Sequence, residues 1–209
     1  MNVIVFGATG SVGRLAVTQM LEQGRHVTAF ARRPERLEND HPNLRRVAGD
    51  AEAFDDVAKA IDGQDAVIVA LGAGMSRSGH VRAQGTLNII NAMQWHGVRR
   101  LICQSTLGAH ESWPNLNFFW KRIMFGALLR PVFKDHERQE DMVRASGLDW
   151  TIVRPGAFTD SPAGGPIREG FGPAERGLRL KISRADVAAF LVRELSDRRY
   201  AGQAVAVSS

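Results

Sequence analysis

Short runs of apolar, often β-branched residues alternate along the chain with segments of helical periodicity. The runs that predict strands are residues 2–6, 26–31, 44–48, 65–71, 99–104, 149–153 and 204–207. The segments that predict helices are 11–23, 53–60, 80–96, about 135–146 and a last one that begins at Ser183. Strands that alternate with helices form a parallel sheet with helices on both faces. The pattern therefore predicts an α/β fold with a doubly wound parallel sheet.

Local signals mark where some of these elements end. Gly24 is expected to close the first helix, and Ser183 with Asp186 three residues later resembles a capping box that has Asp in place of Glu. Residues 155–180 hold six glycines and four prolines, so we expect them to be mostly loop, and long enough to be functional. A length of 209 residues suits one domain, which we expect to span residues 1–209.

Composition excludes several classes of protein. Hydrophobic residues make up 44% and charged residues 23%, as is usual for a folded soluble protein. No run of eighteen apolar residues occurs, and Met1-Asn2 offers no basic region of a secretory signal, so we expect a cytoplasmic location. The single cysteine, Cys103, lies in an apolar run and is expected to be buried and inert rather than reactive. No Cys/His cluster has the spacing of metal ligands, so no metal is expected.

The net charge of +5 favours anionic ligands. The basic residues are scattered, however, and no basic run is longer than two residues. We interpret them as a solvated surface with a local bias toward phosphates, and we expect neither nucleic acid nor membrane as a partner. A scaffold that associates with RNA or a membrane is the alternative, which salt-sensitive binding to nucleic acid would support.

A glycine-rich segment joins the first predicted strand to the first predicted helix. It reads Gly7-Ala8-Thr9-Gly10-Ser11-Val12-Gly13. Gly7 permits a tight turn, Gly10 lets a pyrophosphate approach the backbone, and Gly13 lets the helix pack closely on the strand. The N-terminus of the helix presents free N–H groups and partial positive charge to phosphates. The segment predicts a dinucleotide site, the alternative being a structural βα turn.

The end of the second strand indicates which dinucleotide binds. NAD-selective sites carry an acidic residue there, which accepts hydrogen bonds from the ribose 2′-OH. This chain reads Phe30-Ala31-Arg32-Arg33-Pro34 instead. Arg32 and Arg33 are placed to meet a 2′-phosphate, and one charge-assisted contact of this kind is worth roughly 1.5–3 kcal/mol. We therefore expect NADP(H) as the cofactor, unless both arginines are merely solvated loop residues.

Further motifs follow the glycine loop in a characteristic order. They are Ala70-Leu71-Gly72, Ser105-Thr106, Asp135-His136 ten residues before Ser146-Gly147-Leu148, Arg154-Pro155-Gly156 and Ile182-Ser183-Arg184-Ala185-Asp186-Val187. With the loop at 7–13, this set resembles the atypical short-chain dehydrogenase/reductases over nearly the whole chain. Within them the chain is most similar to the group that contains NADPH-dependent flavin reductase and biliverdin reductase B, with NmrA-like proteins more distant. The resemblance implies a Rossmann fold.

The resemblance also implies a role for each matching position. The residues expected to hold the pyrophosphate are Gly7, Thr9, Gly10, Ser11 and Val12, and those expected at the 2′-phosphate are Arg32 and Arg33. Those expected at the adenine are Asp50 and Ala51, those on the ribose and nicotinamide side are Ala70, Leu71 and Gly72, and those edging the nicotinamide pocket are Pro155, Gly156, Ala157 and Phe158. Asp50 is alternatively a charge at a helix N-terminus, and Pro155-Gly156 a plain bend. Residues 155–180 are expected on the substrate side.

The catalytic residues of many short-chain reductases are matched only in part. Their Tyr-x-x-x-Lys pair, which donates a proton, is absent, because the single tyrosine is Tyr200 and no lysine has the required spacing. Epimerase and ordinary alcohol dehydrogenase chemistry are therefore not expected. Ser105 falls at the family's active-site serine and is expected to bind the substrate or the nicotinamide carboxamide, or else is a simple strand-end serine. His136 falls where relatives carry a lysine or a histidine; it can titrate near neutral pH, or is a surface histidine.

A flavin or quinone acceptor suits a site without a strong acid. Its reduced form is a stabilised anion that takes a proton from water, so the protein chiefly orients two stacked rings. The histidine that biliverdin reductase B carries near Gly156-Ala157 is absent, which argues against tetrapyrrole reduction. We therefore expect a monomeric NADPH-dependent oxidoreductase that acts on a small flavin-like or quinone-like acceptor. The alternative is an NmrA-like sensor that binds NADP(H) without turnover.

An aromatic and basic segment, residues 111–133, follows Ser105. Its aromatic residues Trp113, Phe118 and Trp120 can stack on a planar acceptor, and its basic residues Lys121, Arg122 and Arg130 can meet a phosphate. An amphipathic helix that packs its aromatic side chains on the core is the first alternative. An exposed apolar patch that docks a partner or a membrane surface is the second.

Overall fold

The computed structural model describes residues 1–72, 80–175 and 177–209. Within them the main sheet has eight strands in the order β3-β2-β1-β4-β5-β6-β10-β8. The strands are β1 (Asn2–Phe6), β2 (His26–Ala31), β3 (Leu44–Ala48), β4 (Ala66–Val69), β5 (Arg100–Gln104), β6 (Asp149–Pro155), β8 (Arg168–Glu169) and β10 (Gln203–Ser208). Every neighbouring pair is parallel except β8 and β10. The predicted doubly wound α/β fold is confirmed, with one antiparallel strand added at its edge.

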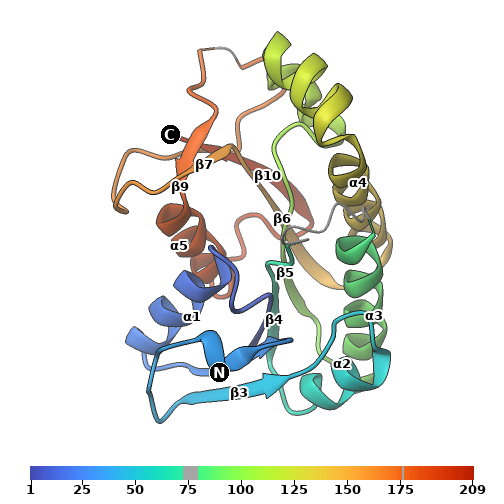
Figure 1. Cartoon of the computed structure of the whole chain (residues 1–209), viewed down its shortest axis with the longest axis vertical. Helices are drawn as coiled ribbons and strands as arrows, with labels where there is room; N and C mark the ends of the chain where they lie inside the picture. The colour runs from blue at the N-terminus through green and yellow to red at the C-terminus, as the bar shows by residue number, and fades with distance from the viewer. Residues whose placement is uncertain (73–79, 176) are drawn as a thin grey trace.

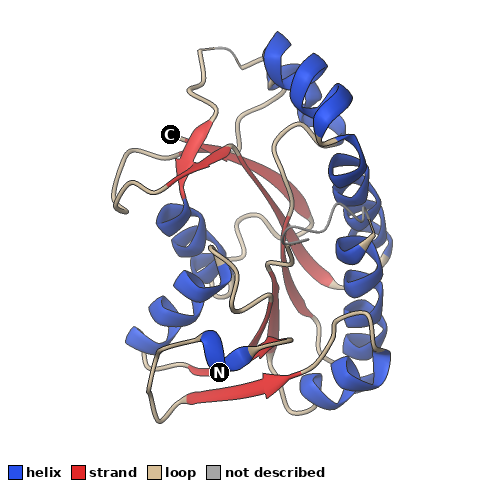
Figure 2. Ribbon diagram, viewed as in Figure 1, coloured by secondary structure: helices blue, strands red, loops and turns tan. Residues whose placement is uncertain are grey.

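Helices cover both faces of this sheet (Figure 1 and Figure 2). The helices are α1 (Gly13–Glu22), α2 (Phe54–Ile61), α3 (Val81–His96), α4 (Arg130–Ala145) and α5 (Arg184–Glu194). Helices α1 and α5 pack together on one face, and α2, α3 and α4 follow one another on the other. Two short 3₁₀ helices are η1 (Pro34–Arg36) and η2 (His110–Asn115), and the π-helical η3 (Phe119–Leu128) has ten residues.

Each central strand is buried on both sides, which explains why its sequence is apolar without interruption. In β1, Val3 and Val5 join the core beneath α1 and α5. Ile4 and Phe6 join the core beneath α2 and α3. Because successive side chains of a strand point to opposite faces, β1 contributes side chains to both cores. The loop that follows β1 is therefore anchored between the two layers of helices.

Several element boundaries differ from the prediction. Helix α1 begins at Gly13 rather than at residue 11, since Ser11 and Val12 form a turn ahead of it. Helix α4 begins at Arg130, five residues before the predicted start, with Pro131 in its first turn, where proline fits a helix. The segment predicted as loop at 155–180 contains β7 (Ala157–Thr159) and β8, and β7 pairs with β9 (Lys181–Ser183) in a second small sheet. Residue 176 of that segment lies outside the described residues.

The two edges of the main sheet are unlike. Strand β3 forms one edge and carries the exposed side chains of Arg45 and Arg46. Strand β8 forms the other edge with only two residues, which pair with Val207 and Ser208 of β10. Among the described residues, no helix is long and apolar enough to cross a membrane.

Candidate functional site

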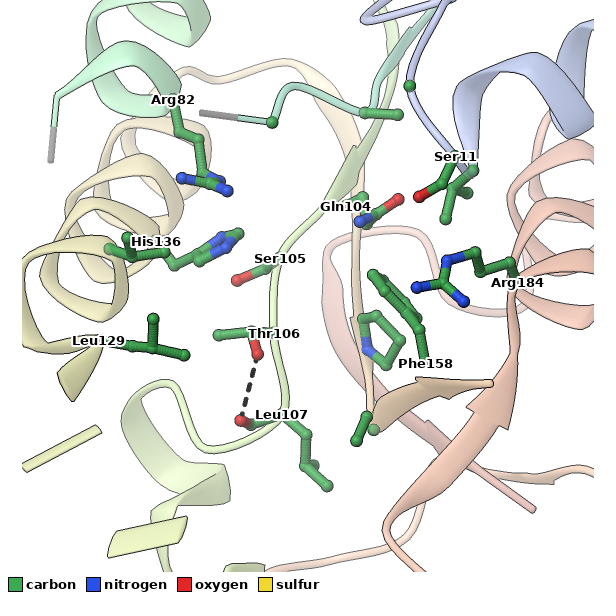
Figure 3. Close-up of a pocket in the computed structure, with 18 of the residues that line it drawn as sticks. Ser11, Arg82, Gln104, Ser105, Thr106, Leu107, Leu129, His136, Phe158 and Arg184 are labelled. Carbon is green, nitrogen blue, oxygen red and sulfur yellow. Dashed lines mark hydrogen bonds between the residues drawn. The ribbon is translucent and has the colours of Figure 1, made fainter. Parts of the chain in front are cut away.

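A cavity of about 490 Å³ opens at the carboxyl ends of the central strands (Figure 3). Ligands bind at this edge in open α/β sheets, where the strand order reverses. Its floor consists of residues at or shortly after the ends of β1, β4, β5 and β6, namely Gly10, Ser11, Val12, Ala70, Leu71, Gly72, Gln104, Ser105, Thr106, Leu107, Pro155, Gly156, Ala157 and Phe158. Its walls consist of Arg82, Leu116, Trp120, Phe125, Leu129, Val132, His136, Leu180 and Arg184.

The glycine loop after β1 is shaped so that side chains do not fit. Gly7 has a φ of +83°, and a Cβ there would lie 2.3 Å from the carbonyl oxygen of Ala70. A Cβ on Gly13 would lie 2.2 Å from the carbonyl oxygen of Gly7, which confines the start of α1 against the loop. The residue before α1, Val12, forms no side-chain cap, so the first turn keeps N–H groups for another acceptor. This turn, tight at its glycines and without a side-chain cap, fits a pyrophosphate.

Thr9 of the glycine loop and the two arginines after β2 lie next to the cavity but do not line it. Phe6 of β1 pairs with Phe30 of β2, so the ends of these strands lie side by side. Arg32 and Arg33, immediately after β2, are both exposed. The structure therefore places two cations beside the glycine loop, where the sequence predicted a 2′-phosphate, and their choice between NADP and NAD stays a prediction.

Asp50 and Ala51 follow β3 and also lie outside the cavity. The Asp50 carboxylate accepts a hydrogen bond from the Glu52 N–H at 3.0 Å, in the turn before α2. Ala51 is buried, and its carbonyl accepts a hydrogen bond from the Asn88 side chain at 2.9 Å. This hydrogen bond agrees with the alternative expected for Asp50, a charge ahead of a helix. The role of Asp50 at the adenine stays a prediction.

The bend after β6 is held from both sides by backbone hydrogen bonds. The Gly156 N–H donates to Val207 at 3.0 Å, and the Ala157 N–H donates to Leu180 at 2.8 Å. A Cβ on Gly156 would lie 2.7 Å from the carbonyl of Leu180. The bend is therefore rigid, and it presents Pro155 through Phe158 to the cavity as one surface.

Ser105 lies at the end of β5 with its hydroxyl committed to a buried carboxylate. The Ser105 Oγ donates to Glu140 Oε1 at 2.6 Å, and Glu140 is fully buried on α4. Arg154 of β6 holds the same carboxylate through Nε at 2.9 Å and Nη2 at 2.5 Å. Because its proton points to Glu140, the Ser105 oxygen faces the cavity as an acceptor. It can receive a hydrogen bond from a carboxamide, but it does not offer a proton.

His136 is buried on α4 rather than exposed on a helix surface, so the surface alternative is wrong. Burial, followed by the nearby charge of Arg82, lowers its pKa to about 3. The imidazole is therefore neutral at physiological pH, and the expectation that it titrates near neutrality is also wrong. Gln139 donates to Thr86, which turns the Gln139 oxygen toward His136 Nδ1 at 3.3 Å. That contact favours a proton on Nδ1 and leaves Nε2 as an acceptor.

Among the described residues that line the cavity there is no Asp, Glu, Tyr or Lys. Tyr200 lies elsewhere, stacked on Phe190 with ring centroids 6.0 Å apart. This described part of the lining therefore contains neutral and positively charged groups without a carboxyl, phenol or ammonium group as proton donor. Its cations are Arg82 and Arg184, on opposite walls (Figure 3).

The aromatic segment 111–133 contributes only part of what was predicted. Trp120 lines the cavity, together with Phe125. Phe118 is 74% exposed, and Trp113 packs against Phe133 outside the cavity. The basic side chains of this segment, at Lys121, Arg122 and Arg130, do not line the cavity. The segment is thus partly a wall of the site and partly packed or exposed surface.

Sequence reasoning missed four polar residues of the cavity, namely Arg82, Gln104, Thr106 and Arg184, and Thr106 appeared only within a family motif. Gln104 directly precedes Ser105 at the end of β5, so the position of that strand end could have revealed it. Arg184 was quoted only as part of a family motif. Arg82 carried no signal, because it lies in a helical pattern with nothing to distinguish it from a surface arginine.

Two other expectations concern thiol and metal chemistry. Cys103 is buried, as predicted, and burial raises the pKa of its thiol far above the ordinary range. Within the residues that the structure describes, no group of three or more His, Cys, Asp or Glu is arranged to hold a metal ion.

Comparison with known proteins adds the family. A family model described as NAD(P)H-binding matches residues 7–198. The chain is 30% identical to UPF0659 protein YMR090W of Saccharomyces cerevisiae, over 93% of this chain and 87% of that protein. It is 28% identical to a Bacillus subtilis protein named uncharacterized sugar epimerase YhfK, over 95% and 89%. The solved structure of ChuY of Escherichia coli O157:H7, titled an anaerobillin reductase, is 25% identical with a TM-score of 0.80, covering 100% of this chain and 97% of that one.

Proposed function

Because the chain belongs to the NAD(P)H-binding family, whose relatives include reductases, we propose that it is an NADPH-dependent reductase of a flavin-like or quinone-like acceptor. One observation carries the choice of acceptor: the described lining of the cavity holds no Asp, Glu, Tyr or Lys. An unactivated ketone needs a proton as it accepts a hydride. A flavin or quinone does not, because its reduced form is a stabilised anion.

NADPH, when bound, supplies a hydride from the nicotinamide ring. Gly10, Ser11 and Val12 would hold its pyrophosphate, and Arg32 and Arg33 its 2′-phosphate. The bend at residues 155–158, held by two backbone hydrogen bonds, lines the cavity and would orient a ring there. The chain's contribution is thus mainly to position two rings and to exclude water.

The polar groups of the cavity have matching roles. Ser105 accepts a hydrogen bond from a ligand N–H, and Glu140 holds it in that orientation. The two arginines of the described lining are partly balanced by carboxylates outside it, Arg82 by Asp135 at 3.7 Å and Arg184 by Asp160 at 2.7 Å. The reduced acceptor then takes its proton from water.

The proposal is tested by following NADPH absorbance in purified protein given FMN, riboflavin or a small quinone. We expect NADPH loss that requires both protein and acceptor and that falls in Ser105→Ala. A ketone substrate serves as the control and should not react. Tight binding of NADPH with no turnover on any of these acceptors would sink the reductase proposal and favour the NADP(H) sensor.

Cofactor preference is tested separately at the two arginines. Replacing Arg32 and Arg33 by Ala should weaken NADPH binding by roughly ten- to a hundredfold per lost charge-assisted contact. NADH binding should stay unchanged, because that cofactor has no 2′-phosphate. Titration of protein fluorescence with each cofactor measures both values. An equal loss for NADPH and NADH would show that the arginines do not meet the 2′-phosphate.

A further inference from the structure

Arg82 is a buried cation in a cavity whose described lining otherwise consists of neutral groups and Arg184. It lies in the first turn of α3 with 9% of its surface exposed. Its guanidinium group lies beside His136 on one wall, facing the gap between that wall and Ser105 (Figure 3). Ser11 of the glycine loop and Phe158 of the bend after β6 lie across the cavity from Arg82 (Figure 3). Because we assign both of those segments to the cofactor, we place Arg82 on the acceptor side.

The protein does not use all the hydrogen-bond donors of Arg82. Its ion-pair partner Asp135 is fully buried and already accepts from two backbone groups, the N–H of Arg82 at 3.0 Å and that of Ala83 at 3.1 Å. The nearest guanidinium nitrogen, Nη1, is 3.7 Å from the carboxylate, too far for a hydrogen bond. Both Nε and Nη1 are buried and without a hydrogen-bond partner among the described residues.

Such an arrangement is costly unless a ligand completes it. Burial lowers the pKa of Arg82, which means that the charged form is less well solvated than in water. A guanidinium group nevertheless remains protonated in a protein, so its unpaired donors stay charged. An oxyanion is the group that matches this planar fork. Nothing anionic in the described lining of the cavity competes for that place.

The neighbouring wall indicates what else the ligand carries. Trp120, Phe125, Leu129 and Val132 line the same cavity, and Leu129 lies on the side of His136 and Arg82 (Figure 3). These side chains suit a planar or apolar ring and offer no charge. A ligand that fills both regions therefore combines a ring with a negatively charged substituent.

We propose that Arg82 binds an oxyanion substituent of the acceptor, a phosphate or a carboxylate, and so selects anionic ring compounds over their uncharged counterparts. This inference rests on the proposed function for the identity of the ligand as the acceptor. Arg82 acts here as a residue of specificity, since no part of the hydride transfer requires it.

FMN and riboflavin form a matched pair of probes, because they share one ring system and differ by a phosphate. Their binding is measured by flavin fluorescence in protein saturated with NADP⁺. The oxidised cofactor prevents turnover and blocks the glycine loop, which would otherwise attract the FMN phosphate. Wild-type protein should bind FMN roughly ten- to a hundredfold more tightly than riboflavin. A naphthoquinone with and without a carboxylate distinguishes a carboxylate site from a phosphate site.

Variants assign the preference to Arg82. In Arg82→Met the preference for FMN should disappear, with affinity for riboflavin and for NADP⁺ retained. Arg82→Lys keeps the charge but loses the planar fork, and should retain part of the preference. Arg138→Met removes the same charge from the exposed face of α4 and should behave as wild type. Thermal unfolding of each variant shows whether it folds. If Arg82→Met does not fold, the flavin preference of Arg82→Lys tests the proposal instead.

Three outcomes overturn the inference. They are equal affinity of wild type for the charged and uncharged member of both pairs, an unchanged preference in Arg82→Met, and a preference lost only in Arg184→Met. The proposed function fails separately: an FMN preference that depends on Arg82 without any NADPH oxidation would leave the anion site standing and the reductase rejected. NADPH-dependent turnover of FMN and riboflavin with equal affinity would support the reductase and reject the anion site at Arg82.

Discussion

His136 borders the cavity, yet the protein around it excludes enough water to keep the imidazole neutral. Ser105 is similarly constrained, because its hydroxyl proton points to Glu140. Both residues could be expected near the site from the sequence, since strand ends and family motifs determine their place. Their chemical states could not, because the contacts that set them come from side chains 35 residues away in the chain or on another helix. At the scale of single residues, position was predictable and protonation was not.

The burial of His136 should make the stability of the protein depend on pH. Its pKa is about 3 in the folded protein and 6.5 ordinarily, so between these values only the unfolded chain binds a proton. The contribution is fully present above about pH 6.5 and is lost as pH falls, by roughly 1 kcal/mol per pH unit. Denaturant unfolding between about pH 5 and 7 should show a shallower dependence in His136→Gln than in wild type.

Another group with a lowered pKa should not obscure this result. Burial raises the pKa of Glu111, but the hydrogen bond from Arg154 and further contacts with arginines outweigh it and lower the pKa to about 2. Its contribution is lost only below the ordinary carboxyl pKa of 4.5. Identical slopes for wild type and His136→Gln above about pH 5 would therefore contradict the assignment to His136.

The elements buried on both faces were the easiest to predict. Strands β1 and β2 match the predicted ranges, because a nearly continuous apolar run between turn signals has few other interpretations. The strands of the 155–180 region were missed, because β7 has three residues and β8 two, too few to show a period of two. The start of α4 was missed because residues 130–134 belong to an aromatic and basic segment whose apolar positions did not distinguish helix from loop.

Two glycines at opposite ends of α1 allow local strain to be separated from effects on the site. Gly13→Ala would place a methyl group 2.2 Å from a backbone oxygen of the glycine loop, whereas Gly24, at φ +73°, has open space around it. Gly24→Ala should therefore cost about 1 kcal/mol of stability and leave cofactor affinity unchanged. Gly13→Ala should cost more and should also weaken NADPH binding at least tenfold, about 1.4 kcal/mol.

Unfolding curves and NADPH titrations of both variants provide the comparison. Normal NADPH affinity in a folded Gly13→Ala protein would mean that the tight contact of α1 with the loop is unrelated to cofactor binding. A loss of NADPH affinity in Gly24→Ala would mean that any perturbation of α1 reaches the site. Either result would remove the link between loop shape and phosphate binding.

For the whole molecule, the cavity unites residues from both halves of the sheet, so cofactor binding should stabilise all of residues 1–209 as one unit. A ligand at 100 times its Kd adds about 2.7 kcal/mol. For a chain of this size the Tm should rise by roughly 5–10 °C with NADPH in one cooperative transition. Calorimetry with and without NADPH checks this. Two separate transitions, only one of them shifted, would contradict the prediction of a single domain.

The global arrangement also explains which parts of the site the sequence could reveal. The glycine loop, the arginines after β2 and the bend after β6 lie at strand ends, and strand ends meet at one edge of any parallel sheet. Arg82 and the aromatic wall lie on helices, whose inward faces depend on how α3, η3 and α4 pack. The residues proposed for the cofactor were therefore accessible to sequence reasoning, and those proposed for the acceptor required the fold.

The two unlike edges of the main sheet affect how readily the protein aggregates at high protein concentration. A strand with free N–H and C=O groups is a template on which another chain can polymerise. Here one border is protected by the positive charges of Arg45 and Arg46, which repel an identical strand, and the other by a strand only two residues long. Neither border offers a long neutral run, so the sheet resists growth into fibrils although its interior strands are rich in valine and isoleucine.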